Sequence, residues 1–128
     1  MNISPESDLQ ATSLSTIAEV GESTISSTVD FERDGVQHGF LKLPYSHDQS
    51  AWGCIMIPIS VVKNGAGPTA LLTGGNHGDE YEGITALLKL AGELRAEDVQ
   101  GRVIIVPAMN YPAVQNGSRP SPIDKGNM

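Results

Sequence analysis

The chain has 128 residues, with 15 acidic and 8 basic side chains and a formal net charge of −7. This acidic excess, with few and scattered cations, argues against a nucleic-acid backbone or an anionic membrane surface as a partner. Hydrophobic residues make up 39% of the chain, which is enough for one buried core. No apolar run approaches the roughly 20 residues of a membrane-spanning helix. The single cysteine excludes an internal disulfide and any metal site made only of cysteines, so we expect a cytoplasmic protein.

Residues 1–23 are rich in Ser, Thr and Glu and show no sustained hydrophobic period. Such a composition is typical of a mobile segment or of a short docking helix. We therefore expect a polar, mobile leader, followed by one folded unit over residues 24–128.

The first half of that unit is predicted to be β structure. Residues 24–31 and 38–46 alternate apolar and polar side chains, and the turn-prone residues 32–35 join them. This pattern predicts a β-hairpin or two edge strands. Residues 52–65 are apolar, rich in β-branched side chains, and end at an Asn-Gly turn. Pro58 lies inside this segment and has no N–H to donate, so we expect it at a sheet edge or a bulge.

The second half is predicted to be a βαβ unit. Residues 68–75 form a short apolar run closed by two glycines, which predicts a strand buried on both faces. Hydrophobic side chains at helical spacing over residues 79–95 predict a helix, with Asp79 as its N-cap. Residues 102–110 predict a second apolar strand, parallel to the first and reached by a right-handed crossover. The residues from Tyr111 onward are rich in Pro, Gly, Asn and Ser and predict a long loop.

The junction of the first of these strands with the helix, residues 74–83, is the most informative stretch. Binding sites in open α/β sheets form at this carboxyl edge of the strands. His77 lies on the turn and Glu80 in the first helical turn, so a ring nitrogen and a carboxylate can meet at one point. This pair, with no thiolate nearby, suits zinc or a similar cation. A solvated helix start carries the same residues, and the spacing alone does not decide between the two interpretations.

Longer strings carry a family resemblance. TGGNHGDEYEG at residues 73–83, VPAMNYPAV at 106–114 and GSRPSPIDKGNM at 117–128 together resemble the zinc-dependent succinylglutamate desuccinylase/aspartoacylase family. That family is related to the zinc carboxypeptidases, and the resemblance spans residues 28–128. It implies an α/β fold with a zinc-carboxypeptidase-like mixed sheet and helices on both faces. This chain would be its N-terminal portion, with edge β strands followed by the βαβ unit.

The resemblance also implies roles for residues. His77 and Glu80 would be two of the three ligands of one zinc ion, and the third ligand, a histidine, would lie outside this chain, as would the general-base glutamate. Arg119 would help to polarise the scissile carbonyl and stabilise the oxyanion. His38 and His47 lie where the family has no ligand, and we expect them to be surface or strand residues. The chain without the remaining C-terminal part of the enzyme is expected to be inactive.

Further polar residues accompany these motifs. Asn110 ends the second predicted parallel strand, and Asp124 and Asn127 lie in the tail; each either contacts substrate or holds the loop in shape. Asp79 either orients His77 through the second ring nitrogen or caps the helix, and we favour the cap.

The wording of residues 31–46, 50–65 and 117–128 is nearest to family members of ectoine degradation. These hydrolyse the acetyl amide of N-alpha-acetyl-L-2,4-diaminobutyrate to acetate and L-2,4-diaminobutyrate, which implies a small N-acetylated diamino acid as the partner. The alternatives are a deacylase of another N-acyl amino acid, such as N-acetylaspartate or N-succinylglutamate, an enzyme cleaved in its exposed loop, and a non-catalytic binding module. The joint presence of His77, Glu80 and Arg119 counts against the module. The oligomeric state stays open, a homo-oligomer included.

Overall fold

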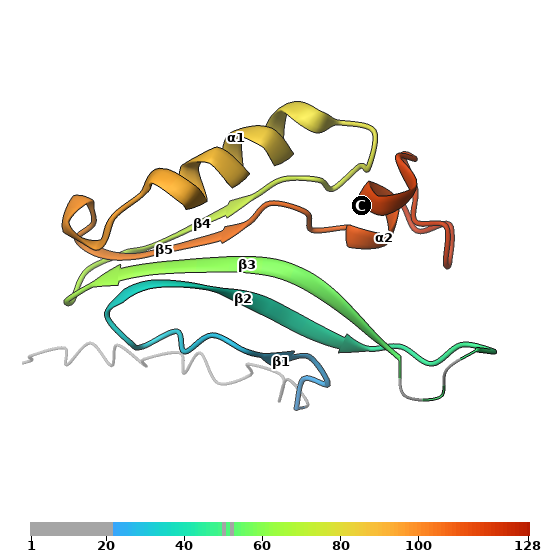
Figure 1. Cartoon of the computed structure of the whole chain (residues 1–128), viewed down its shortest axis with the longest axis horizontal. Helices are drawn as coiled ribbons and strands as arrows, with labels where there is room; N and C mark the ends of the chain where they lie inside the picture. Colours follow the sequence, from blue (N-terminus) through green and yellow to red (C-terminus); the bar gives the residue numbers. More distant parts are fainter. Residues whose placement is uncertain (1–21, 50, 52) are drawn as a thin grey trace, which may run out of the picture.

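A computed structural model describes residues 22–49, 51 and 53–128, so the expected leader lies almost wholly outside the described residues. The described residues form a five-stranded mixed sheet in the order β1-β2-β3-β5-β4. The long helix α1 runs beside β4 and β5, and the short helix α2 lies beyond the carboxyl end of β5 (Figure 1). The predicted α/β class with a mixed sheet is confirmed.

The antiparallel half of the sheet consists of β1 (Ser26–Ser27), β2 (Gly35–Pro44) and β3 (Cys54–Asn64). Pairing of β1 with β2 confirms the predicted antiparallel strands, although β1 has only two residues. The β2–β3 register is continuous over both strands, with Pro58 opposite Phe40. Since β5 pairs only with residues 60–64 of β3, Pro58 falls where β3 has a single neighbour, and its predicted edge position is confirmed.

The parallel half consists of β4 (Thr69–Thr73), α1 (Tyr81–Glu93), a 3-10 turn at Ala96–Asp98, and β5 (Gly101–Val106). The predicted strand–helix–strand order and the parallel pairing of β4 with β5 are confirmed. The prediction that β4 is buried on both faces is wrong, because Leu71 is 60% exposed. Among the described residues β4 is the last strand of the sheet and pairs with β5 alone, so its apolar sequence has too few neighbours to cover it.

The tail contains a helix that was not predicted. Strand β5 ends at Val106, and after a turn the chain forms α2 (Tyr111–Asn116). Pro112 lies in its first turn, where a missing N–H costs nothing, and Gly117 ends it in the left-handed conformation with a φ of 61°. Both signals stand in the sequence, but six residues are too few to show a helical period.

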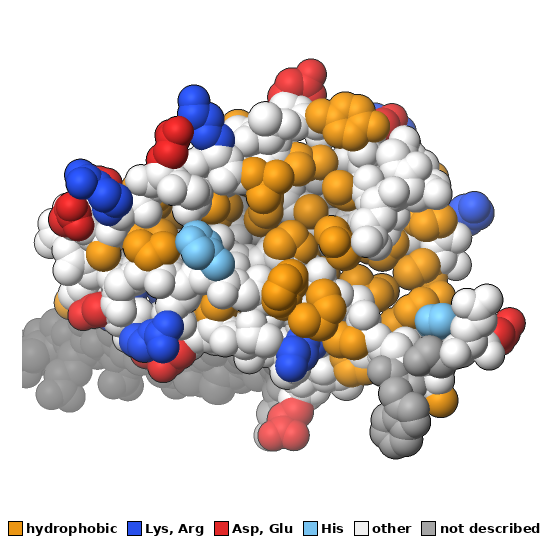
Figure 2. All heavy atoms as spheres, in the orientation of Figure 1, with side chains coloured by type: hydrophobic (Ala, Val, Ile, Leu, Met, Phe, Trp, Pro, Cys, Tyr) orange, Lys and Arg blue, Asp and Glu red, His pale blue; other side chains and the backbone are white. Residues whose placement is uncertain are grey.

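The core lies against the central strands β3 and β5. Val61 and Val62 of β3 and Ile105 of β5 are the largest fully buried side chains, and Val29, before β2, packs into the same cluster as Val61. Hydrophobic side chains also gather across the middle of the face shown in Figure 2. No helix among the described residues is long and apolar enough to cross a membrane. The packed central strands provide a rigid base for the loops at their ends.

Candidate zinc and substrate site

The loop between β4 and α1 is held against the two segments that follow β5. The N–H of Met109 donates to the carbonyl oxygen of Gly74 at 2.8 Å, and the N–H of Gly78 donates to that of Ser118 at 3.0 Å. A Cβ atom on Gly78 would overlap the carbonyl of Ala113 in α2, so only glycine permits this close approach. The contact brings the loop that carries His77 beside the tail that carries Arg119.

His77, Glu80 and Arg119 lie in direct contact at this point. The Nδ1 atom of His77 is 2.9 Å from Oε1 of Glu80, and the guanidinium of Arg119 donates to the same oxygen at 3.0 Å. His77 comes from the loop, Glu80 from the start of α1, and Arg119 from the tail after α2. The three residues with the strongest predicted roles are therefore neighbours.

The charge state of Glu80 follows from these contacts. The hydrogen bond with His77, and then the one from Arg119, hold the pKa of the Glu80 carboxyl below its usual value. A carboxylate must be ionised to bind a metal ion, and Glu80 is kept in that form at neutral pH.

The helix cap differs from the prediction. Glu80, and not Asp79, is the N-cap residue of α1, and the Glu80 side chain makes no capping hydrogen bond. The Glu80 side chain makes no capping bond because its carboxylate contacts His77 and Arg119 instead of the first helical N–H groups. The alternative role of Asp79, orienting His77, is filled by other atoms, since both ring nitrogens of His77 contact other side chains.

Asn127 supplies the contact on the far side of the imidazole. Its Oδ1 atom lies 2.8 Å from Nε2 of His77, although the two residues are 50 positions apart. A histidine that binds a metal through one nitrogen usually donates its other N–H to an oxygen, which fixes the ring. The sequence indicated Asn127 as a possible substrate contact but not as a partner of His77, because no spacing rule connects residues so far apart.

The spacing and the chemistry of the His77–Glu80 pair fit zinc. Two atoms bound to a tetrahedral zinc at about 2.0–2.1 Å lie roughly 3.3 Å apart, and the His77–Glu80 distance of 2.9 Å is close to this value. One imidazole and one carboxylate are zinc-type donors. Across residues 22–49, 51 and 53–128, no group of three or more His, Cys, Asp or Glu side chains could hold a metal. The pair therefore fits zinc as part of a ligand set.

The other two histidines lie away from this centre. His38 is an exposed residue of β2 whose ring contacts the Ser60 hydroxyl at 2.8 Å. His47 is exposed in the loop after β2. Both positions agree with the expectation of surface or strand residues.

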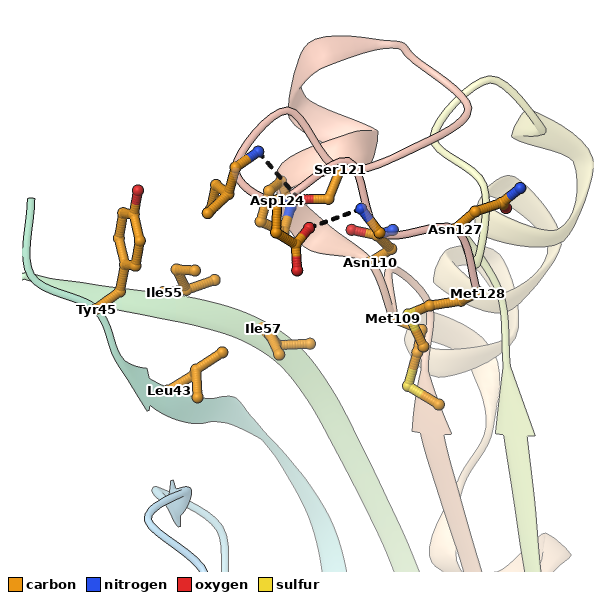
Figure 3. Close-up of a pocket in the computed structure, with 13 residues that line it drawn as sticks. Leu43, Tyr45, Ile55, Ile57, Met109, Asn110, Ser121, Asp124, Asn127 and Met128 are labelled. Carbon is orange, nitrogen blue, oxygen red and sulfur yellow. Dashed lines mark hydrogen bonds between the residues drawn. The ribbon is translucent and has the colours of Figure 1, made fainter.

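A hollow of about 300 Å³ opens next to Asn127, between the tail and the first half of β3 (Figure 3). Its walls are mostly apolar, and Ile55 and Ile57 form one side. Asn110, which is only 6% exposed, and Asp124 line it as well. A second hollow, of about 340 Å³, lies beside His77 and Glu80. The structure thus places Asn110 and Asp124 on the apolar hollow, and Asn127 both there and in contact with His77.

Part of the chain is similar to a known catalytic domain. The model of the succinylglutamate desuccinylase/aspartoacylase catalytic domain matches residues 66–128, the segment that contains His77, Glu80 and Arg119. Residues 66–128 of this chain are thus similar to the catalytic domain of that family.

Individual members of the family are similar over most of the chain. N-alpha-acetyl-L-2,4-diaminobutyric acid deacetylase of Halomonas elongata is 76% identical over 106 residues, which cover 83% of this chain and 31% of that protein. The product-bound ectoine utilization protein EutE (DoeB) of Ruegeria pomeroyi is 68% identical with a TM-score of 0.81, over 83% of this chain and 32% of that chain. A succinylglutamate desuccinylase from Silicibacter sp. TM1040 is 65% identical with the same TM-score and the same coverage of both chains. This chain spans about a third of the length of these relatives.

Proposed function

We propose that the protein acts in the hydrolysis of the acetyl amide of N-alpha-acetyl-L-2,4-diaminobutyrate, which yields acetate and L-2,4-diaminobutyrate in ectoine degradation. The observation that carries this proposal is the 76% identity with the Halomonas elongata deacetylase. The contact between His77, Glu80 and Arg119 supports it, because that cluster supplies metal-binding and charge-stabilising groups at one point.

Zinc is part of the proposal. His77 and Glu80 would hold the ion together with a histidine from sequence outside this chain. When bound, zinc polarises an amide carbonyl and lowers the pKa of a water molecule to about 7. Asn127 would keep the His77 ring in the orientation in which Nδ1 faces the ion, because its Oδ1 lies 2.8 Å from Nε2 and would accept the Nε2–H.

Arg119 would act on the amide itself. Hydrolysis adds a water oxygen to the carbonyl carbon, breaks the carbon–nitrogen bond and transfers a proton to the leaving amine. Negative charge develops on the carbonyl oxygen during the first of these events. One guanidinium nitrogen of Arg119 is engaged by Glu80, and the remaining N–H groups of the planar fork are suited to that oxygen. The glutamate that accepts the proton of water would also come from outside this chain.

A second substrate class is favoured by a specific observation. The Silicibacter sp. TM1040 structure, 65% identical to this chain, is described as a succinylglutamate desuccinylase. A succinylated amino acid requires the same zinc chemistry but a pocket for a larger, anionic acyl group. The choice between the two substrates is therefore one of pocket shape and charge rather than of mechanism.

The proposal is tested by assaying the protein at its natural full length against three amides and measuring its zinc content. The amides are N-alpha-acetyl-L-2,4-diaminobutyrate, N-acetylaspartate and N-succinylglutamate. We expect about one zinc ion per chain and the highest kcat/KM for the acetylated diamino acid. Preference for either of the other amides would overturn the substrate assignment, and full activity without bound metal would overturn the role of zinc. The 128-residue chain should be inactive when assayed alone. The cytoplasmic location expected from the lone cysteine stays part of this proposal.

A further inference from the structure

The backbone of Ser118, the residue before Arg119, is hydrogen-bonded to two other segments. Its N–H donates to the carbonyl oxygen of Ala113 in α2 at 3.1 Å, and its own carbonyl oxygen accepts the N–H of Gly78 at 3.0 Å. Gly78 follows His77 in the loop between β4 and α1. The backbone of Ser118 therefore joins α2 to the loop that carries the zinc-type histidine.

The Ser118 hydroxyl adds two hydrogen bonds around Arg119. It donates to the carbonyl oxygen of Pro120 at 2.9 Å and accepts an N–H of the Asn116 side chain at 2.9 Å. Asn116 is the last residue of α2, and Pro120 directly follows Arg119. The hydroxyl thus connects the end of α2 with the residue after Arg119, so the chain is held on both sides of this arginine.

The Arg119 side chain has little other support. It is 53% exposed, and among the described residues its guanidinium bonds only to Oε1 of Glu80, at 3.0 Å. An arginine side chain is long and has many rotamers, and few contacts restrict those of Arg119. The backbone that places its Cα atom therefore decides where the guanidinium lies.

We infer that Ser118 is a positioning residue, whose hydroxyl fixes the backbone around Arg119 so that the guanidinium reaches both Glu80 and the carbonyl oxygen of the substrate. This role rests on the proposed deacetylase function and deepens it. Removal of the hydroxyl would leave the two backbone bonds of Ser118 in place, so the turn would keep its fold while the Pro120 carbonyl would lose its donor. The loss would fall on the rate and not on the metal, because the hydroxyl contacts neither His77 nor Glu80.

The first test is Ser118→Ala in the protein at natural full length. With the amide that the parent hydrolyses fastest, we expect kcat to fall about 10-fold, with KM and zinc content nearly unchanged, because a small displacement of a group that acts in the transition state lowers kcat. The matched control is Ser27→Ala in β1, where the hydroxyl likewise donates to the carbonyl oxygen two residues on, that of Val29, at 3.1 Å. It should leave kcat unchanged.

Three outcomes of this test would count against the role. An unchanged kcat in Ser118→Ala would overturn it while leaving the deacetylase function standing. Loss of zinc from Ser118→Ala would also overturn it, because the hydroxyl would then support the metal site as a whole. A parent that hydrolyses none of the three amides would overturn the proposed function and this role together.

The second test asks whether the hydroxyl acts through Arg119. In an Arg119→Ala background, adding Ser118→Ala should change kcat less than about twofold, since the group that it positions is already gone. Asn116→Ala, at an exposed position, removes a partner of the hydroxyl without removing the hydroxyl. It should lower kcat by a smaller factor, again only when Arg119 is present. An equal loss of kcat from Ser118→Ala with and without Arg119 would show a merely structural role and would overturn the inference.

Discussion

The two ends of the sheet both carry charged side chains, yet the charges are arranged differently. Where β3 ends, Lys63 forms an ion pair of its own with Asp34 at 2.9 Å. At the opposite end, after β4, the single carboxylate of Glu80 contacts both His77 and Arg119. At one end Lys63 thus has a carboxylate partner of its own, and at the other end two nitrogen-bearing side chains contact one oxygen.

The two ends also differ in how their arginines, Arg102 and Arg119, are hydrogen-bonded. Arg102, at the same end as Lys63, pairs with Glu32 at 2.6 Å. It also donates to the carbonyl of Phe31 at 2.8 Å and to the Thr69 hydroxyl at 3.2 Å, and its side chain is 23% exposed. Arg119 is 53% exposed, and among the described residues its guanidinium bonds to Glu80 alone. The several acceptors around Arg102 fix neighbouring segments to one another, whereas Arg119, with one acceptor, retains more donors for a ligand.

Loss of His77 should have the largest effect, because it removes one metal ligand of the candidate site. In His77→Ala at natural full length, we expect zinc content to fall from about one per chain to near zero and activity to fall to background. Elemental analysis and the deacetylase assay measure both. His38→Ala is the matched control and should retain metal and activity. A His77→Ala protein that keeps its zinc would disprove the assignment of this ligand.

Arg119→Ala should lower kcat by about 10²- to 10³-fold, as does the loss of one group that stabilises a developing oxyanion. Zinc content should not change, because Arg119 contacts Glu80 without being a ligand. The control is Arg95→Ala, since Arg95 is 66% exposed and pairs with Glu97 and Asp98. If Arg119→Ala lost zinc in parallel with activity, Arg119 would be holding Glu80 in place rather than acting on substrate.

Asn127→Ala should have a smaller effect on the metal, because it removes a residue that orients a ligand. We expect zinc to bind about 10- to 100-fold more weakly, as for other contacts behind a metal ligand, measured by competition with a chelator. Asn64→Ala removes an amide at the opposite end of the sheet, where it donates to the Val99 carbonyl at 3.0 Å, and should leave zinc affinity unchanged. Equal affinities for Asn127→Ala and the parent would refute this role.

The smallest effect is expected for Asp34, and it depends on pH. The hydrogen bond from Lys63, and then the one from the Gly65 N–H, hold the pKa of Asp34 below its usual value. A lowered pKa stabilises the fold above the ordinary carboxyl pKa of about 4, and this stabilisation is lost as the pH falls through the lower, folded value. Asp34→Asn should therefore unfold slightly more easily than the parent at pH 7, and the two should converge in strong acid.

Urea unfolding at several pH values measures the Asp34 effect. Lys63→Gln should reproduce most of the loss, since it removes the main partner, and the double variant should be no less stable than the sum of the two single changes predicts. An Asp34→Asn protein whose stability differs from the parent equally at every pH would show that the ion pair is not the cause.

Sequence patterns alone predicted the features that depend on residues close together in the chain. The strand–helix–strand order after residue 68 and the pairing of His77 with Glu80 follow from strand and helix spacing, which a single sequence displays. The same spacing misassigned the cap, since it cannot show that the Glu80 carboxylate is engaged by Arg119 from 39 residues away. The short helix α2 was not predicted from the sequence. Too few residues lie between Pro112 and Gly117 to show a helical period of hydrophobic side chains.

By itself, the sequence determined the α/β class, the βαβ unit, the zinc-type pair at its turn, and the strings that relate the chain to its family. The tertiary structure alone decided that Leu71 is exposed at a sheet edge, that Asn127 contacts His77, and that Asp124 faces an apolar hollow. The physical reason is the range of the contacts. Helix and strand geometry repeats over a few residues, whereas the approach of the tail to the β4–α1 loop depends on Gly78 packing without a side chain against α2.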